Sequence, residues 1–184
     1  MATYTVNLFT TLDGFGTGPV AYWGKDGPEL RAWHARTFFR GENQTLVFGA
    51  NTYRMMARFA AQFAGDPNFA ALSAARKIVI SRTLAAPLTW ANAALIAADA
   101  VEAVPRLKAE SPVPLYSHGS IAMNRALLAA GLVDRLEVVV FPIITGASGA
   151  NPILAGLPDI DLELVDARLF DGRVQYLAYV PTVR

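Results

Sequence analysis

The sequence predicts an α/β fold in which a mixed, mostly parallel sheet ends in an antiparallel hairpin. Between Leu115 and Gly149 an apolar run, a helix-length segment and a second apolar run follow one another, which is typical of a β-α-β unit. Other short apolar runs end in glycine or hydroxyl residues before helix-length segments. Near the end of the chain, Asp171-Gly172 separates two strand-like runs and is a strong signal for a hairpin turn.

The stretch from Leu115 to Gly149 has clear internal boundaries. The apolar run from Val113 to Tyr116 reads as a strand, and a helix is expected to open at Ser120. Gly131 stands just past the last helical residue, where a left-handed residue closes a helix at low cost. The run from Leu136 to Ile144 is then a second strand, which we expect to be parallel to the first and buried.

The remaining elements follow from the same signals of periodicity, capping and turn residues. We expect the other strands at Tyr4–Thr10, Thr45–Phe48, Lys77–Ile80, Leu95–Ile96, Asp161–Phe170 and Arg173–Val180. We expect the other helices at Pro28–Arg40, from Thr52 through Met56, at Asp66–Ala75 and at Asp99–Lys108.

Composition limits the class of protein. The chain has 184 residues and no linker or repeat, so we expect one domain over residues 1–184. A net charge of +1 and the lack of a basic cluster argue against nucleic acid as a partner, and no apolar run is long enough to span a membrane. The chain has no cysteine, and its first residues alternate like a strand rather than forming a signal peptide. We therefore expect a cytoplasmic protein.

A hydrophobic fraction of 53% is high for a chain of this size, which leaves much of its surface exposed. This imbalance predicts a homodimer that covers part of the apolar surface. The strands at Leu136–Ile144 and Arg173–Val180 are the candidates for the contact.

Several common catalytic motifs are absent from the sequence. No P-loop and no Gly-x-Ser-x-Gly elbow occur. The two histidines, His34 and His118, lie far apart in the sequence, so no zinc site is expected and we predict no metal. A Gly-x-Gly-x-Gly spacing begins at Gly14, but Pro19 follows it directly and no helix opens there, so a Rossmann nucleotide site is not indicated.

The strand ends are therefore the best candidates for a binding site, because ligands of open α/β sheets bind beyond the carboxyl ends of the strands. Five such ends are rich in glycine or hydroxyl residues, at residues 10–18, 49–52, 81–83, 118–120 and 145–149. Gly119 either lets an anionic group approach the backbone or serves the turn alone. Asp13 is either a ligand or acid–base group, or an Asx-turn residue that holds its loop.

Taken together, these segments resemble the dihydrofolate reductase-like superfamily, and most closely its branch related to the C-terminal reductase domain of the bifunctional riboflavin-biosynthesis deaminase-reductase. The matching pieces span almost the whole chain in the right order. They are residues 11–15 (TLDGF), 49–53 (GANTY), 77–84 (KIVISRTL), 119–120 (GS) and 131–136 (GLVDRL), followed by Pro142 and Gly146.

The resemblance implies a three-layer α-β-α fold with NADPH lying across the strand ends. It places the cofactor on three turns, made of Gly49, Ala50, Asn51, Thr52, Ser81, Arg82, Thr83, His118, Gly119, Ser120 and Ile121. Within this set, Gly119-Ser120 would hold the pyrophosphate and Arg82 would meet the adenosine 2′-phosphate. Relatives often carry arginine where this chain has Ala50, so one cation expected to favour NADPH over NADH is missing. They commonly carry a second glycine where this chain has His118, whose imidazole would either crowd the pyrophosphate or bond to it.

The resulting hypothesis is a reductase that transfers hydride from NADPH to a pterin- or pyrimidine-like heterocycle. Asp13 is the candidate catalytic residue and substrate contact, and Phe15, Trp23 and Trp33 are candidate neighbours of the substrate ring. The alternative is a protein that binds a nucleotide or heterocycle without turnover. A folate-specific reductase is less favoured, because the acidic residue expected on the first long helix is absent and Glu29 stands only at its start.

Overall fold

The computed structural model describes residues 1–17, 25–38 and 43–184. Its strands are β1 (Tyr4–Thr11), β2 (Phe15–Thr17), β3 (Thr45–Gly49), β4 (Lys77–Ile80), β5 (Ala93–Ile96), β6 (Leu115–Ser117), β7 (Arg135–Phe141), β8 (Ala150–Pro152), β9 (Ile160–Phe170) and β10 (Val174–Val183). Its helices are α1 (Pro28–Phe38), α2 (Ala50–Gln62), α3 (Pro67–Ala74), α4 (Ala100–Glu110), α5 (Ile121–Ala129) and the short 3₁₀ helix η2 (Gly146–Ser148).

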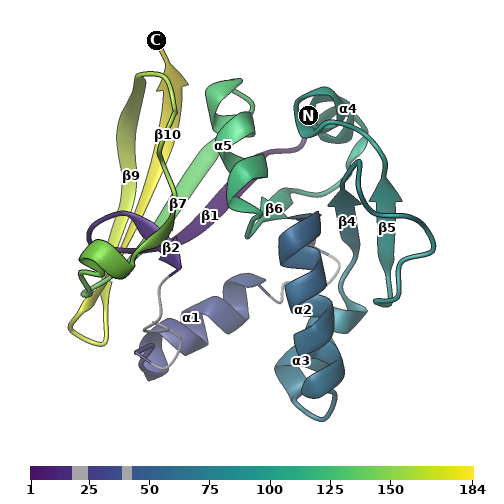
Figure 1. The fold of residues 1–184 in the computed structure, drawn as a ribbon, viewed down its shortest axis with the longest axis horizontal. Coiled ribbons are helices and arrows are strands. Elements are labelled where there is room, and N and C mark those ends of the chain that lie inside the picture. Colours follow the sequence, from purple (N-terminus) through teal and green to yellow (C-terminus); the bar gives the residue numbers. More distant parts are fainter. Residues whose placement is uncertain (18–24, 39–42) are drawn as a thin grey trace.

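An eight-stranded sheet forms the middle layer, in the order β5-β4-β3-β6-β1-β7-β10-β9. The first six of these strands are parallel, and β10 is antiparallel to both of its neighbours. Helices α4 and α5 pack on one face, and α1, α2 and α3 cover the other (Figure 1). The predicted three-layer α/β fold with a mostly parallel sheet and an antiparallel C-terminal hairpin is confirmed.

The β6-α5-β7 segment differs from the prediction in one respect. Its two strands are parallel, but β1 lies between them and pairs with both. Strand β7 also ends at Phe141 rather than at Ile144, because Pro142 has no N–H to continue the ladder. The helix end is as expected, since Gly131 has φ +65° and Leu132 N–H donates to the Leu127 carbonyl at 3.0 Å, as in a Schellman motif.

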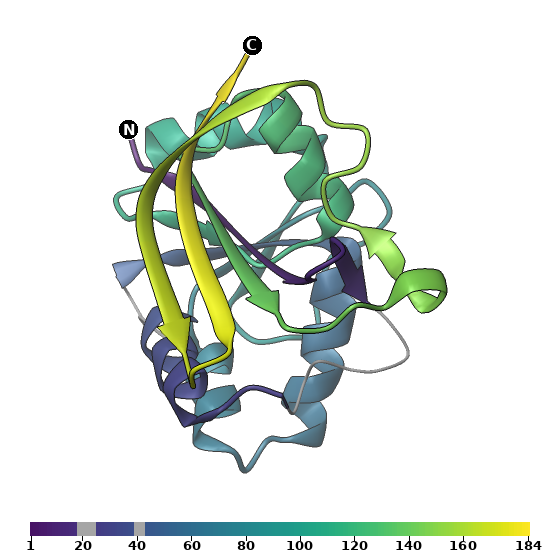
Figure 2. The ribbon, with the colours of Figure 1, turned by 90° about the vertical axis from the view of Figure 1, so that its left-hand side faces the viewer.

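The C-terminal hairpin is long and curved, and its turn lies beside the start of α1 (Figure 2). Asp171 and Gly172 both have positive φ, at +52° and +65°, as the predicted two-residue turn requires. A small second sheet, in which β2 pairs with β8, was not expected from the sequence. Within the described residues, no helix combines the length and apolar character needed to cross a bilayer.

Candidate functional site

Two helices begin side by side at the carboxyl ends of neighbouring strands. β3 pairs with β6 in parallel, so α2 and α5 start at the same edge of the sheet (Figure 1). The two turns contact each other directly, because Gly49 N–H donates to the Gly119 carbonyl at 3.0 Å. The structure therefore brings together Gly49, Ala50, Asn51 and Thr52 with Gly119, Ser120 and Ile121.

The glycines of these turns are required by close packing. A Cβ on Gly49 would collide with Ser120 Oγ, and a Cβ on Gly119 would lie 2.7 Å from Thr52 Oγ1. Gly119 also has φ +130°, a conformation that L side chains rarely adopt. Turn packing thus explains both glycines, and evidence for a ligand must come from the helix ends themselves.

Neither helix end is capped by a side chain. Gly49 at the N-cap of α2 and Ser120 at the N-cap of α5 make no side-chain capping bond, and neither first turn contains an acidic residue. The first N–H groups of a helix have no intrahelical partner and carry partial positive charge. Two such ends in contact form a place suited to an anion such as a pyrophosphate.

The strand β4 ends next to β3, and its turn uses its own hydroxyl groups. Ser81 Oγ accepts from Thr83 N–H at 3.0 Å and from Leu84 N–H at 3.2 Å. Arg82 extends into solvent, with its Nη2 3.8 Å from Asp99 Oδ2. The predicted phosphate-binding segment, Ser81 to Thr83, therefore lies beside the α2 turn. The guanidinium of Arg82 is exposed to solvent, with the carboxylate of Asp99 nearby.

The carboxylate of Asp13 joins two loops. It accepts from Thr145 N–H at 3.0 Å and from Gly146 N–H at 2.8 Å, and so ties the end of β1 to the loop after β7. A hydrogen bond from Thr11 lowers the pKa of Asp13 most, and together with the backbone N–H groups it outweighs the opposing desolvation and holds the pKa at about 2. Asp13 is ionised at neutral pH, so it cannot donate a proton there, and the geometry favours the loop-holding alternative.

The predicted aromatic neighbours of the substrate have different environments. Phe15 belongs to β2, where it pairs with Pro152. Trp33 is 6% exposed and packs against Phe170 and Tyr176, at ring distances of 5.5 and 4.8 Å, which gives it a core role. Trp23 lies outside the described residues.

His118 occupies a place that the sequence reasoning did not anticipate. Its ring lies 4.0 Å from that of Phe38 and 5.1 Å from that of Tyr116, within an aromatic cluster beneath α1. His34, on α1, lies in the same cluster, with its ring 5.1 Å from that of His118. Burial lowers the pKa of both imidazoles, that of His34 to about 4. Their residue types were visible in the sequence, but no sequence signal indicated that they meet.

A buried carboxylate lies on the same face of the sheet. Glu137 accepts from Tyr116 Oη at 2.5 Å, Tyr176 Oη at 2.9 Å, Arg135 Nε at 3.1 Å and Asn7 Nδ2 at 3.3 Å. These donors satisfy both carboxylate oxygens inside the protein. Glu137 therefore organises the layer beneath the aromatic cluster rather than forming an open acid–base site.

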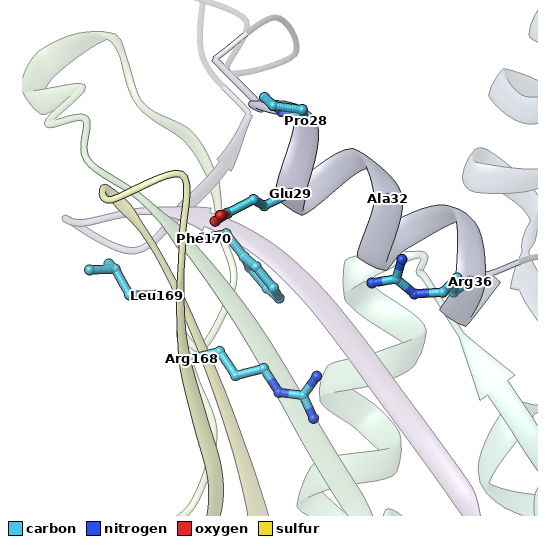
Figure 3. A pocket seen from close by; sticks show the side chains of 7 residues that line it. All are labelled: Pro28, Glu29, Ala32, Arg36, Arg168, Leu169 and Phe170. Carbon is cyan, nitrogen blue, oxygen red and sulfur yellow. The ribbon is translucent and has the colours of Figure 1, made fainter.

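The structure also has a hollow between α1 and β9, with a volume of about 540 Å³, in which the side chains of Arg36 and Arg168 lie on opposite sides (Figure 3). Arg168 is already bound to Asp166 at 2.7 Å. None of the strand-end residues lines this hollow, so it is separate from the candidate site. The described part of the chain holds no cluster of three or more His, Asp or Glu side chains suited to a metal ion.

Comparison with known proteins agrees with this architecture. Residues 2–176 match the family described as the RibD C-terminal domain. No match was found among curated protein sequences.

Solved structures are also similar to the chain. A putative riboflavin biosynthesis protein from Shewanella sp. PV-4 superposes with a TM-score of 0.78 at 20% identity, covering 99% of each chain. Dihydrofolate reductase from Enterococcus faecalis, complexed with NADP(H), gives 0.63 at 16% identity, covering 98% of this chain and 96% of that one. A diaminohydroxyphosphoribosylaminopyrimidine deaminase/5-amino-6-(5-phosphoribosylamino)uracil reductase from Thermotoga maritima gives 0.69 at 15% identity, covering 98% of this chain and 57% of that one.

Proposed function

The chain belongs to the RibD C-terminal domain family, and from this premise we propose that it is an NADPH-dependent reductase acting on a small pyrimidine-like heterocycle. The observation that carries the proposal is the contact between the uncapped starts of α2 and α5. A dinucleotide pyrophosphate placed there would supply the anion that both helix ends lack. The proposed substrate class also includes pterin-like heterocycles.

The proposed cofactor site uses three adjacent turns. The backbone at Gly49 and Ser120 would bind the pyrophosphate, and Arg82, with Ser81 and Thr83 beside it, would bind the adenosine 2′-phosphate. This assignment is supported by the sheet order, since β4, β3 and β6 are consecutive neighbours. Arg82 would have to form its charge-assisted contact in competition with Asp99.

The bound nicotinamide would supply the hydride, and the protein would position the ring to be reduced. Asp13 would act on the substrate side by fixing the loop at the end of β1, because its oxygens already hold Thr145 and Gly146. Proton donation would have to come from another group or from water, since the pKa of Asp13 is lowered to about 2. The reductase named for the Thermotoga neighbour acts on a substituted uracil, which supports testing uracils before pterins.

The test measures cofactor binding and turnover separately. NADPH and NADH would be titrated into the protein by isothermal calorimetry, and NADPH oxidation would then be followed with ribosylamino-substituted uracils and with dihydropterins. We expect NADPH to bind and a substituted uracil to be reduced. Binding without oxidation of NADPH by any compound of the panel would favour a binding protein without turnover, and no binding of either nucleotide would refute the proposal.

We also propose that the protein forms a homodimer through the outer strand of the hairpin. The sequence led us to expect exposed apolar surface, and one group of it lies on β9, where Leu162, Leu164, Val165 and Leu169 are each more than 40% exposed. The two strands expected near the contact, β7 and β10, are interior strands of the eight-stranded sheet, whereas β9 is one of its two edge strands. A second copy at β9 would cover both the apolar side chains and an unpaired strand edge.

The dimer is tested by multi-angle light scattering at low micromolar concentration. We expect twice the mass of the chain, with an interface of at least about 1,000 Å² in total. Leu164→Lys should shift the mass toward the monomer, whereas a matched exposed change away from β9, Leu12→Lys, should not. A monomer mass for the unmodified protein would contradict this proposal.

A further inference from the structure

The two histidines of the chain meet in the folded protein. His34 lies on α1 and His118 follows β6, yet their rings are 5.1 Å apart and nearly perpendicular. Phe9 from β1 lies 5.3 Å from the ring of His34 and 6.1 Å from that of His118, and Phe38 packs on both histidines. Three segments distant in sequence thus build one cluster of four rings, which we call the histidine cluster.

The polar atoms of this cluster are incompletely used. The Nε2 atoms of His34 and His118 are buried and have no hydrogen-bond partner among the described residues, although each residue as a whole is partly exposed. A buried polar atom without a partner loses its hydrogen bonds to water and gains none in return, so two of them in one cluster are unfavourable for packing alone. Such unpaired atoms call for an explanation, and the position of the cluster supports a role in binding a polar ligand.

The position of the cluster is next to the proposed cofactor site. His118 directly precedes Gly119 and Ser120, at the start of α5. Val6 pairs with Ser117 in the parallel ladder, so Asn7 and His118 follow on the same face of the sheet. Asn7 Oδ1 is a third buried atom without a partner. These unpaired atoms therefore gather beside the end of β6, next to the start of α5 and the proposed cofactor site.

We propose that His34 and His118 recognise the amide-type edge of the substrate heterocycle, an N–H beside a C=O as in a uracil ring. This inference rests on the proposed function. A neutral imidazole offers one donor and one acceptor, so two of them can donate to the carbonyl and accept from the ring N–H. The burial that lowers the pKa of both histidines keeps them neutral at physiological pH. Because Phe9 and Phe38 pack against these imidazoles, their side chains would have to move for the substrate ring to enter.

Two uracil probes distinguish hydrogen bonding to the ring N–H groups from simple packing of the ring. The first is 5,6-diaminouracil, which carries ring N–H groups. The second is 5,6-diamino-1,3-dimethyluracil, in which methyl groups replace those hydrogens. We expect the unmodified protein to bind the first at least 10-fold more tightly than the second, by calorimetry in the presence and absence of NADPH.

Histidine variants assign that preference to the cluster. In His34→Phe and in His118→Phe the ratio of the two dissociation constants should fall toward one, and His118→Gln, which keeps a donor and an acceptor, should restore part of it. Trp90→Phe is the matched control, since it removes a buried nitrogen and its 2.9 Å bond to Ser73 on α3, while its ring packs against Phe48 and Tyr53 rather than against a histidine. It should lower the melting temperature and leave the ratio unchanged.

Nuclear magnetic resonance decides the matter even if a variant fails to fold. With two histidines in the chain, a ¹⁵N-histidine spectrum has two sets of ring signals. We expect 5,6-diaminouracil to shift the Nε2 resonances of both. Unshifted signals, or a ratio of dissociation constants that is the same in the phenylalanine variants, would overturn the inference while leaving NADPH binding, which is measured separately, to judge the proposed function.

Discussion

The starts of the helices fall into two groups that differ in how their N–H groups are satisfied. Among the described residues, α1, α3 and α4 are capped by carboxylates. Asp66 caps α3 and Asp99 caps α4, each from the N-cap position, while Asp171 reaches α1 from the hairpin turn and accepts from Glu29 and Leu30 N–H at 3.0 and 3.1 Å. By contrast, α2 and α5 begin at Gly49 and Ser120 without any side-chain cap.

This difference separates helix ends that serve stability from helix ends available for binding. A carboxylate cap compensates the N–H groups and the partial positive charge of the first turn within the protein. The two uncapped ends are also the two that contact each other at the carboxyl edge of the sheet, so a single anion can serve both. We expect mutations in the first group to change folding and mutations in the second to change cofactor binding.

The largest effect is expected for Gly49→Ala. Its new Cβ would collide with Ser120 Oγ and push the α2 and α5 turns apart, although the backbone of Gly49, at φ −82°, tolerates alanine. NADPH affinity should fall at least about 30-fold, which corresponds to ~2 kcal/mol. Calorimetric titration of NADPH measures this, with circular dichroism to check that the variant is folded.

A second substitution tests whether crowding causes the loss. Ser120→Gly removes the hydroxymethyl group that the new Cβ would meet, so the double variant should recover much of the NADPH affinity. Gly119→Val is a less informative change, because φ +130° strains any β-branched residue whatever its neighbours. If Gly49→Ala binds NADPH normally, the contact between the two helix ends is not the cofactor site.

Asp171→Ala should act on stability alone. It removes the carboxylate that accepts from the first N–H groups of α1 and the link between α1 and the hairpin turn, so the free energy of unfolding should fall. Urea unfolding should show the lower stability, and NADPH affinity should stay within twofold of the unmodified protein. A large loss of NADPH affinity in this variant would remove the distinction between the two groups of helix ends.

Arg82→Ala should affect the two nicotinamide cofactors differently. Losing an exposed charge-assisted contact to the 2′-phosphate should weaken NADPH by about 1 kcal/mol, and NADH, which has no such phosphate, should bind as before. Asp99→Asn should have the opposite effect and strengthen NADPH binding slightly. It removes the carboxylate 3.8 Å from Arg82 and keeps a side chain that can cap α4. Equal losses for both cofactors in Arg82→Ala would exclude the 2′-phosphate assignment.

The smallest expected effect is a change with pH in the stability that Asp171 contributes. Burial raises the pKa of Asp171, but the backbone N–H groups of Glu29 and Leu30 outweigh it and hold the pKa below its usual value of 3.8. The contribution of this carboxylate to stability is therefore present above pH 3.8 and is lost as the pH falls below that value. The difference in unfolding free energy between the unmodified protein and Asp171→Ala should narrow between pH 5 and pH 3. A gap that stays constant over this range would show that the carboxylate charge does not matter.

Part of the candidate site could be predicted from the sequence because its signals are local. Gly49, Gly119 and Ser120 were found at strand ends, and the structure does bring them together. Arg82 was found in the next turn, and it is indeed exposed beside that site. The sequence did not predict which helix ends lack a cap, because the cap of α1 comes from Asp171, which is 142 residues away from Glu29 in the sequence.

The sequence by itself determined most of the helices and strands, and the turns that end them. Gly131 ends α5 and Asp171-Gly172 turns the hairpin because the left-handed conformations needed there favour a few residue types, whatever surrounds them. The apolar runs likewise fixed which segments became buried strands of a mostly parallel sheet.

Only the tertiary structure decided which of these elements are neighbours. Strand order placed β1 between β6 and β7 and made β9 an edge strand, and the packing of α1 on the sheet brought His34 against His118. It also buried Lys77, which satisfies its charge by donating to the carbonyls of Leu72, Ser73 and Ala75 at the end of α3. Backbone preferences act over a few residues, whereas these contacts depend on how whole strands and helices pack, and a hydrophobic pattern is compatible with several such arrangements.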